Sequence, residues 1–242
     1  MTGSALHVET TPGTDPVLVL LHRGLNSLRS WDPFVPGIAC GRRLVTYDRR
    51  GFGASPRDAV LDARLFHRDA DDLAELLEQI DATPAHLVGH SDGATVALVT
   101  AARHPEVVRS VTAIAGHLRA EEPLRRLLLE SPLSSWGKRT TDECRERHGD
   151  DWRDVAAAWY ELWTSTLADW DIEAELAAIR CPVLVVHDKR DVLAPPDHGE
   201  GVARSVPHAV LSWYDTGRHG PHVAERERFE RELEAHLRAA EA

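Results

Sequence analysis

Short runs of apolar residues alternate along the chain with longer stretches in which apolar residues recur every three to four positions. The uninterrupted runs predict strands that are buried on both faces, and the spaced pattern predicts amphipathic helices. Strands that alternate with helices favour a parallel sheet with right-handed crossovers. The pattern predicts strands over residues 5–9, 17–21, 44–47, 87–90, 107–115 (after a short helical turn), 183–186 and 209–214, a turn over 11–16, and helices over 67–80, 92–103, 200–204 and 223–239.

The alternation breaks between residues 117 and 180, where the composition becomes charged and rich in tryptophan. Trp152, Trp159, Trp163 and Trp170 fall at offsets of 7, 11 and 18, which predicts one shared helical face. We interpret this stretch as a helical cap insertion over the sheet, within a single domain of residues 1–242. A chain of 242 residues is long enough for one large α/β core.

The composition of the chain argues against several classes of function. The net charge of −11 argues against a nucleic-acid-binding protein. Three widely spaced cysteines favour neither a disulfide framework nor a zinc site, and they fit a reducing cytoplasm. Residues 1–14 do not contain a basic segment followed by an apolar stretch, and no apolar run reaches about 18 residues, so we expect a cytoplasmic protein that does not bind membranes.

The run from Leu87 leads into Gly89-His90-Ser91-Asp92-Gly93, and a helical pattern of small residues follows. This G-x-S-x-G sequence between a strand and a helix is typical of a nucleophile elbow. The two glycines allow a tight turn that exposes the Ser91 hydroxyl, and the start of the next helix directs free N–H groups toward the same place. The pattern predicts Ser91 as a nucleophile.

A serine nucleophile needs a base within hydrogen-bond reach and a carboxylate that orients the base. Asp191 follows the strand predicted at 183–186, and His219 follows the strand at 209–214. Both therefore lie at the carboxyl edge of a parallel sheet, where ligands bind. Asp188 competes for the role of the acid, and His222 for that of the base.

The chain resembles the α/β-hydrolase family over nearly its whole length, and within it small bacterial esterase-like serine hydrolases with a Gly-His-Ser-Asp-Gly elbow. The resemblance implies an α/β-hydrolase fold, a mostly parallel central sheet flanked by helices with a helical cap insertion. The matching pieces, in order, are His22-Arg23-Gly24 with Ser27 and Trp31, Asp48 to Gly53, Gly89 to Gly93, Asp191 with Pro195, and Gly217 to His222.

The resemblance implies a catalytic triad in which Ser91 is the nucleophile, His219 the general base and then acid, and Asp191 the orienting carboxylate. It also implies an oxyanion hole formed by the backbone N–H groups of Asp92 and Gly24. Many relatives have glycine after the first histidine of this loop, whereas this chain has Arg23. That side chain would bind a substrate carboxylate or point to solvent.

Other candidates surround these residues. His117 ends a predicted strand and is a candidate to line the substrate pocket, as are Arg23, Trp159 and Trp163. His22 and His90 resemble family positions that support loops by hydrogen bonding. The resemblance implies no metal and no other cofactor.

We expect a serine hydrolase that cleaves a small carboxylic ester, thioester or lactone through an acyl-enzyme. The alternatives are a carbon–carbon bond hydrolase of the meta-cleavage type and a ligand receptor that keeps the fold without turnover. An aspartate at the position of Ser91 would indicate a dehalogenase or epoxide hydrolase, and this chain has none there. The expected partner is a small ester-like molecule, and the sequence leaves a homodimer open.

Overall fold

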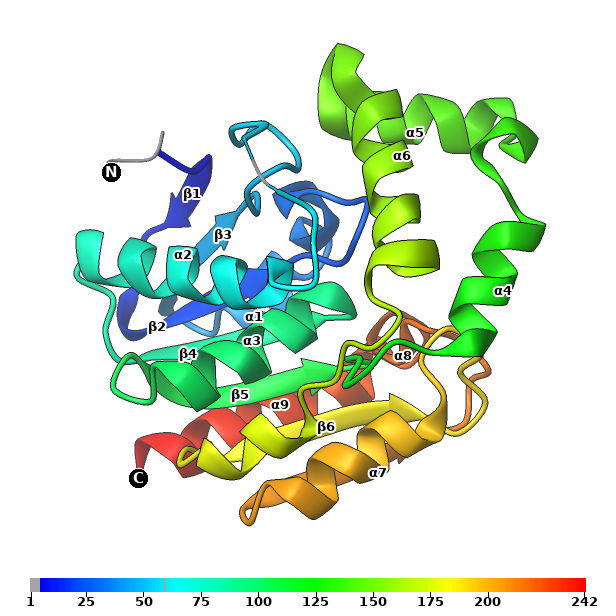
Figure 1. Cartoon of the computed structure of the whole chain (residues 1–242). Coiled ribbons are helices and arrows are strands. Elements are labelled where there is room, and N and C mark those ends of the chain that lie inside the picture. The colour runs from blue at the N-terminus through cyan, green and yellow to red at the C-terminus, as the bar shows by residue number, and fades with distance from the viewer. Residues whose placement is uncertain (1–4, 59) are drawn as a thin grey trace.

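A seven-stranded sheet crosses the computed structural model, which describes residues 5–58 and 60–242 (Figure 1). The strand order is β1-β3-β2-β4-β5-β6-β7, and all neighbours are parallel except β1 with β3. The predicted α/β-hydrolase fold is confirmed. The strands are β1 (Val8–Thr11), β2 (Thr14–Leu21), β3 (Arg42–Tyr47), β4 (Ala85–His90), β5 (Val108–Ile114), β6 (Val183–Asp188) and β7 (Ala209–Tyr214).

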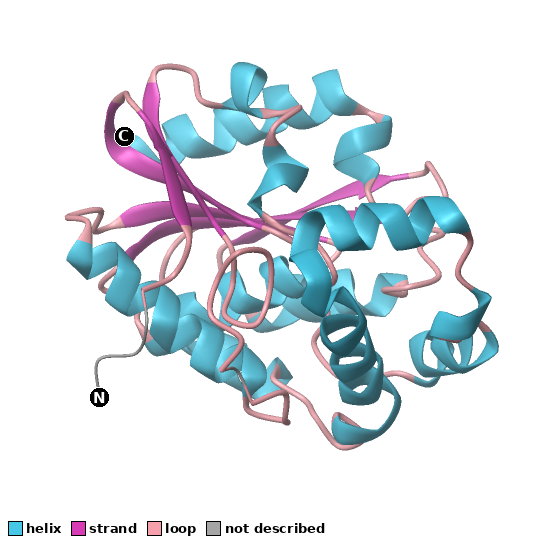
Figure 2. Ribbon diagram, turned by 90° about the horizontal axis from the view of Figure 1, so that it is seen from above, coloured by secondary structure: helices cyan, strands magenta, loops and turns pink. Residues whose placement is uncertain are grey.

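Helices cover both faces of the twisted sheet (Figure 2). Alternate residues of β2 face opposite sides, as the period of two requires. Val17, Val19 and Leu21 belong to the core cluster that also contains residues of α2, α3 and α7, while Leu18 and Leu20 belong to the cluster that contains residues of α1 and α9. The helices are α1 (Val35–Ile38), α2 (Leu65–Gln79), α3 (Asp92–Arg103), α4 (Glu122–Glu130), α5 (Lys138–His148), α6 (Trp152–Glu161), α7 (Pro196–Ser205), α8 (Pro221–Ala224) and α9 (Arg226–Glu241).

The N-terminal strands differ from the prediction. β1 lies at 8–11 rather than 5–9, and it pairs antiparallel with β3, with Val8 opposite Tyr47. β2 begins at Thr14, which pairs with Arg42, so the turn predicted at 11–16 is wrong for most of its length. At this edge of the sheet, backbone pairing extends the strands through polar residues, so the apolar pattern of the sequence does not indicate where the strands begin and end.

Two helices also begin elsewhere than predicted. α7 starts at Pro196, a residue whose fixed φ suits the first turn of a helix, rather than at residue 200. The helix predicted at 223–239 is divided into α8 and α9, because Glu225 has φ −120° and ψ 57° and leaves the helical conformation.

The segment between β5 and β6 contains α4, α5 and α6, and it lies beyond the carboxyl ends of the strands (Figure 1). The shared face predicted for its tryptophans is wrong. Trp152 packs with Cys144 and Ala156, whereas Trp163 and Trp170 join the main core beside Phe66. A π-helical turn at Leu162–Thr166 shifts the register after α6, and Trp170 lies beyond that turn.

None of the helices formed by residues 5–58 and 60–242 has both the length and the apolar character needed to cross a bilayer.

Candidate active site

Ser91 lies at the turn between β4 and α3, with φ 55° and ψ −122°. Few residues other than glycine adopt a positive φ, and strain of this kind gathers at functional sites. A Cβ on Gly93 would lie 2.3 Å from the Leu21 carbonyl oxygen, and one on Gly89 would lie 2.2 Å from the Gly93 carbonyl oxygen. Only glycine fits at these two positions, so the sequence around Ser91 forces the sharp turn.

Asp191 and His219 come together in the loops after β6 and β7. The Asp191 Oδ2 atom lies 2.8 Å from Nδ1 of His219. Its other oxygen, Oδ1, accepts hydrogen bonds from the backbone N–H groups of Leu193 and Ala194. Burial would raise the pKa of Asp191, but the hydrogen bond and charge of His219 and these N–H groups hold it below its usual value. The ionised carboxylate thus fixes the His219 ring with a proton on Nδ1, which leaves Nε2 free to accept another.

Asp188, the competing acid, has a different set of partners. Its carboxylate accepts hydrogen bonds from both the backbone N–H and the hydroxyl of Thr216, each at 2.6 Å, and from the N–H of Gly217 at 3.0 Å. A further bond comes from the N–H of Arg190. Asp188 therefore holds the loop that carries His219 and does not contact the His219 ring in place of Asp191.

Asp92 and Gly24, the predicted oxyanion-hole residues, lie side by side. Asp92 is the first residue of α3, so its N–H has no acceptor within the helix. A Cβ on Gly24 would lie 2.6 Å from Oδ2 of Asp92 and 2.3 Å from Nε1 of Trp159. This close approach explains why the loop needs glycine there, and it places the Gly24 backbone next to the start of α3.

Sequence reasoning missed the buried ion pairs below the elbow. The fully buried guanidinium of Arg49 lies 2.7 Å from Asp69 and 3.4 Å from Asp92. Burial raises the pKa of Asp69 to about 6 in spite of the nearby arginine. The indole of Trp159 also donates to Asp92, at 2.9 Å. Nothing in the run Asp48-Arg49-Arg50 distinguishes the fully buried Arg49 from the partly exposed Arg50.

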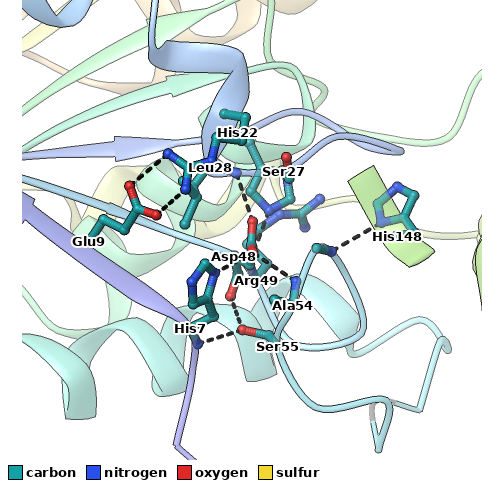
Figure 3. A network of polar contacts seen from close by, with 12 residues as sticks. His7, Glu9, His22, Ser27, Leu28, Asp48, Arg49, Ala54, Ser55 and His148 are labelled. Carbon is teal, nitrogen blue, oxygen red and sulfur yellow. Dashed lines mark hydrogen bonds and ion pairs between the residues drawn. The ribbon is translucent and has the colours of Figure 1, made fainter. Parts of the chain in front are cut away.

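The loop after β3 is fixed by Asp48, as Figure 3 shows. Its carboxylate accepts hydrogen bonds from the backbone N–H groups of Leu28 and Ala54 and contacts the ring of His7. His22 donates from Nδ1 to the carbonyl of Arg23 and accepts at Nε2 from the N–H of Arg49. These bonds hold the 22–28 loop against the loop after β3.

Further histidines surround the His219 ring. The Nε2 atom of His90 lies 2.8 Å from the backbone carbonyl oxygen of His219. This contact supports the loop that carries His219. His117 is buried, with its ring centroid 5.9 Å from that of His219 and 4.7 Å from that of Trp163. His222 packs against the rings of Trp31, Phe34 and Phe229 instead of Asp191.

The other predicted pocket residues take separate positions. Trp163 is buried in the core, and its ring separates His117 from Phe66. Trp159 is partly exposed and contacts the elbow through Asp92. Arg23 lines a cavity of about 560 Å³ with His90 and His222, and Ser91, which is 6 % exposed, is not in its lining.

Buried neutral histidines make the stability of the fold depend on pH. Burial, aided by the charges of His219 and Arg23, lowers the pKa of His222 to about 3. The unfolded chain binds a proton there below about pH 6.5 and the folded chain does not, so stability falls as the pH falls. When the pH falls from 7 to 5, the free energy of unfolding should decrease by about 2 kcal/mol because of this one ring.

Urea unfolding at both pH values should show that His222→Phe removes this part of the pH dependence. Phenylalanine fits the aromatic surroundings, and the buried Nδ1 atom of His222 has no hydrogen-bond partner to lose. His208→Gln, at an exposed position, is the control and should behave like the wild type. If the stability of His222→Phe depended on pH as that of the wild type does, the low pKa of His222 would not be a source of this dependence.

Within residues 5–58 and 60–242, no three or more His, Cys, Asp or Glu side chains are grouped so that they could hold a metal ion.

Comparisons with known proteins show relatives of similar length. The protein named "Putative carbamate hydrolase RutD" from Caulobacter sp. (strain K31) is 26% identical, over 90% of this chain and 89% of its own. Serine hydrolase BPHL from Homo sapiens is 27% identical, over 97% of this chain and 84% of its own.

Solved structures share the fold. The α/β hydrolase MGS-M2 from a Medee basin deep-sea metagenome library has a TM-score of 0.81 at 19% identity and covers 96% of this chain and 94% of its own. The enol-lactonase from Burkholderia xenovorans LB400 has a TM-score of 0.76 at 21% identity, with 96% of both chains covered. The model of the alpha/beta hydrolase fold family matches residues 16–171, which is more than half of the sequence. The chain belongs to the α/β-hydrolase fold family.

Proposed function

We propose that this protein is a serine hydrolase that cleaves a small carboxylic ester, thioester or lactone through an acyl-enzyme. The observation that carries the proposal is the 2.8 Å contact between Asp191 and His219, at the same sheet edge as the strained turn of Ser91. A serine in that turn with an oriented histidine nearby is the arrangement that nucleophilic acyl transfer needs. The 27% identity to a protein named as a serine hydrolase supports this class.

In the proposed mechanism, the Ser91 oxygen attacks the carbonyl carbon of the substrate while Nε2 of His219 takes the hydroxyl proton. The Asp191 carboxylate accepts a hydrogen bond from Nδ1–H of His219, and its negative charge stabilises the imidazolium that forms. The carbonyl oxygen becomes an oxyanion, which the N–H groups of Asp92 and Gly24 bind. His219 then gives its proton to the leaving oxygen or sulfur, and the acyl group stays on Ser91.

Water reverses these steps in the second half of the reaction. His219 takes a proton from a water molecule, whose oxygen attacks the acyl carbon, and the proton returns to the Ser91 oxygen as the acid leaves. The net reaction consumes one ester and one water and yields one acid and one alcohol; a thioester yields an acid and a thiol, and a lactone yields a hydroxy acid.

We also propose that residues 117–180 form a cap over this site. Trp159 donates to Asp92, the residue after the nucleophile, so α6 contacts the elbow directly. His117 and Trp163 lie on the same side of His219 and add aromatic surface. An apolar cover of this kind would bind the acyl or alcohol group of the substrate.

Reaction with p-nitrophenyl acetate tests the proposal. The enzyme should release a burst of p-nitrophenol of about one equivalent per site before the steady state. Mass spectrometry of the acid-quenched, digested protein should then find one acetyl group on the peptide that contains Ser91. Acetyl groups on another peptide, or none at all, would contradict an acyl-enzyme at Ser91 and would favour a receptor without turnover.

A further inference from the structure

A cavity of about 560 Å³ adjoins the candidate active site on the side of His90. Polar and cationic groups form much of its lining, among them Arg23, Asn26, Ser27 and Arg147. His90 both lines the cavity and precedes Ser91 in the chain, and its ring centroid is 5.1 Å from that of His219. A molecule in this cavity therefore lies against His90, which is the neighbour of both Ser91 and His219.

Arg23 is the unusual side chain in this lining. It is only partly exposed, yet no ion pair or side-chain hydrogen bond joins its guanidinium to any other residue within 5–58 and 60–242. Burial and the charge of Arg147 lower the pKa of Arg23, and the more distant charges of Asp92 and Glu143 offset this only in part. Removing a charge from water without a partner costs free energy. A group held in this way has its hydrogen-bonding capacity free for a ligand.

The carboxylates near Arg23 do not take this role. Asp48 also lines the cavity, but its two oxygens already accept bonds from Leu28, Ala54 and His7. Glu146 is exposed at the rim. Of the other two carboxylates whose charges act on Arg23, Glu143 pairs with Arg147, and Asp92 contacts Arg49 and accepts a hydrogen bond from Trp159. Arg23 is therefore the cation of this lining that has no carboxylate partner of its own, and it suits an anion.

We propose that Arg23 binds a free carboxylate of the substrate, so that the substrate is a monoester or lactone of a compound that carries a second, ionised carboxyl group. This inference rests on the proposed hydrolase function. The planar guanidinium offers two parallel N–H donors to a carboxylate, a geometry that also fixes the orientation of the substrate. Arg23 directly precedes Gly24 in the 22–28 loop. A substrate held by Arg23 would therefore have its ester carbonyl near the proposed oxyanion hole.

Paired esters that differ only in one charge test this specificity. The substrates are the monomethyl and dimethyl esters of succinate, glutarate and adipate, which place the free carboxylate at three distances from the scissile bond. The wild type should hydrolyse the monomethyl ester of at least one length with a kcat/KM ten or more times that of its dimethyl ester. Arg23→Gln should lose this preference, chiefly through a higher KM, and Arg23→Lys should retain part of it.

Arg29→Gln is the matched control. Arg29 lines the outer part of the same cavity, but it is exposed and Glu9 pairs its guanidinium. Its replacement should leave the ratio of the two kcat/KM values as in the wild type. A preference for the monomethyl ester that survives in Arg23→Gln, or a wild type that prefers the dimethyl ester, would overturn the assignment.

A binding measurement separates this inference from the proposed hydrolysis. Calorimetry with Ser91→Ala should detect binding of monomethyl glutarate, weaker binding of dimethyl glutarate, and loss of the difference when Arg23→Gln is added. If p-nitrophenyl acetate gives no burst and no acetylated Ser91 but this binding pattern is found, the hydrolase proposal fails and the carboxylate site stands. If esters are hydrolysed and the two compounds bind alike, the carboxylate site fails alone.

Discussion

Ser91→Ala is expected to abolish labelling by a fluorophosphonate probe and to lower kcat for ester hydrolysis by about 10⁶-fold. The hydroxyl oxygen is the atom proposed to attack the substrate, and no other side chain at the elbow can replace it. The variant should fold, because alanine adopts the φ of 55° at about the same cost as serine and removes only one atom. Probe labelling followed by gel fluorescence, with kcat for p-nitrophenyl acetate, measures both effects.

Ser135→Ala is the matched control, since Ser135 is exposed on the segment between β5 and β6. It should be labelled as strongly as the wild type. Circular dichroism of Ser91→Ala should show an unchanged fold. Labelling that persists in a folded Ser91→Ala protein would mean that the nucleophile lies elsewhere in the chain.

The core of the fold was predictable because its strands are buried on both faces. The uninterrupted apolar run 17–21 ends where the structure ends β2. The run 209–214, which Ser212 interrupts, ends where the structure ends β7, although that strand is only partly buried. The elbow was predictable because two glycines and a serine in that spacing admit one sharp turn. Local sequence determines these features, so the pattern alone identifies them.

Features that depend on distant contacts were not predictable. The opening strand was predicted at 5–9, but its bounds at 8–11 follow from its pairing with β3, because its own sequence has little apolar content. The tryptophan spacing suggested one helix, but the π-helical turn at Leu162–Thr166 is a property of packing rather than of spacing. The burial of Arg49 between Asp69 and Asp92 likewise requires three separate segments to meet.

The candidate site also contains both features that the sequence predicts and features that only the structure shows. Its residues were predictable as a set, since the carboxyl ends of parallel strands meet at one edge. Their individual partners were not, because Asp188 and Asp191 follow the same strand and are three positions apart. Only the structure shows that one of them contacts the ring of His219 and the other the backbone before it.

Asp191→Asn is expected to lower kcat by about 10⁴-fold, and Asp188→Asn by far less. An amide at position 191 would present an N–H to Nδ1 of His219, which favours the tautomer with its proton on Nε2, where the Ser91 proton must go. The imidazolium would also lose its charge partner. At position 188 the change weakens bonds to Thr216 and Gly217, so it should act on stability, at about 1 to 3 kcal/mol.

The two variants form a matched pair, because each replaces one carboxylate by its amide, at the last residue of β6 or three positions after it. Measuring kcat with p-nitrophenyl acetate and the free energy of unfolding in urea separates the two effects. Asp191→Asn should lose activity out of proportion to stability, and Asp188→Asn should lose stability out of proportion to activity. If instead Asp188→Asn gave the larger fall in kcat, the orientation of His219 would depend on the loop that Asp188 holds, and the role proposed for Asp191 would be wrong.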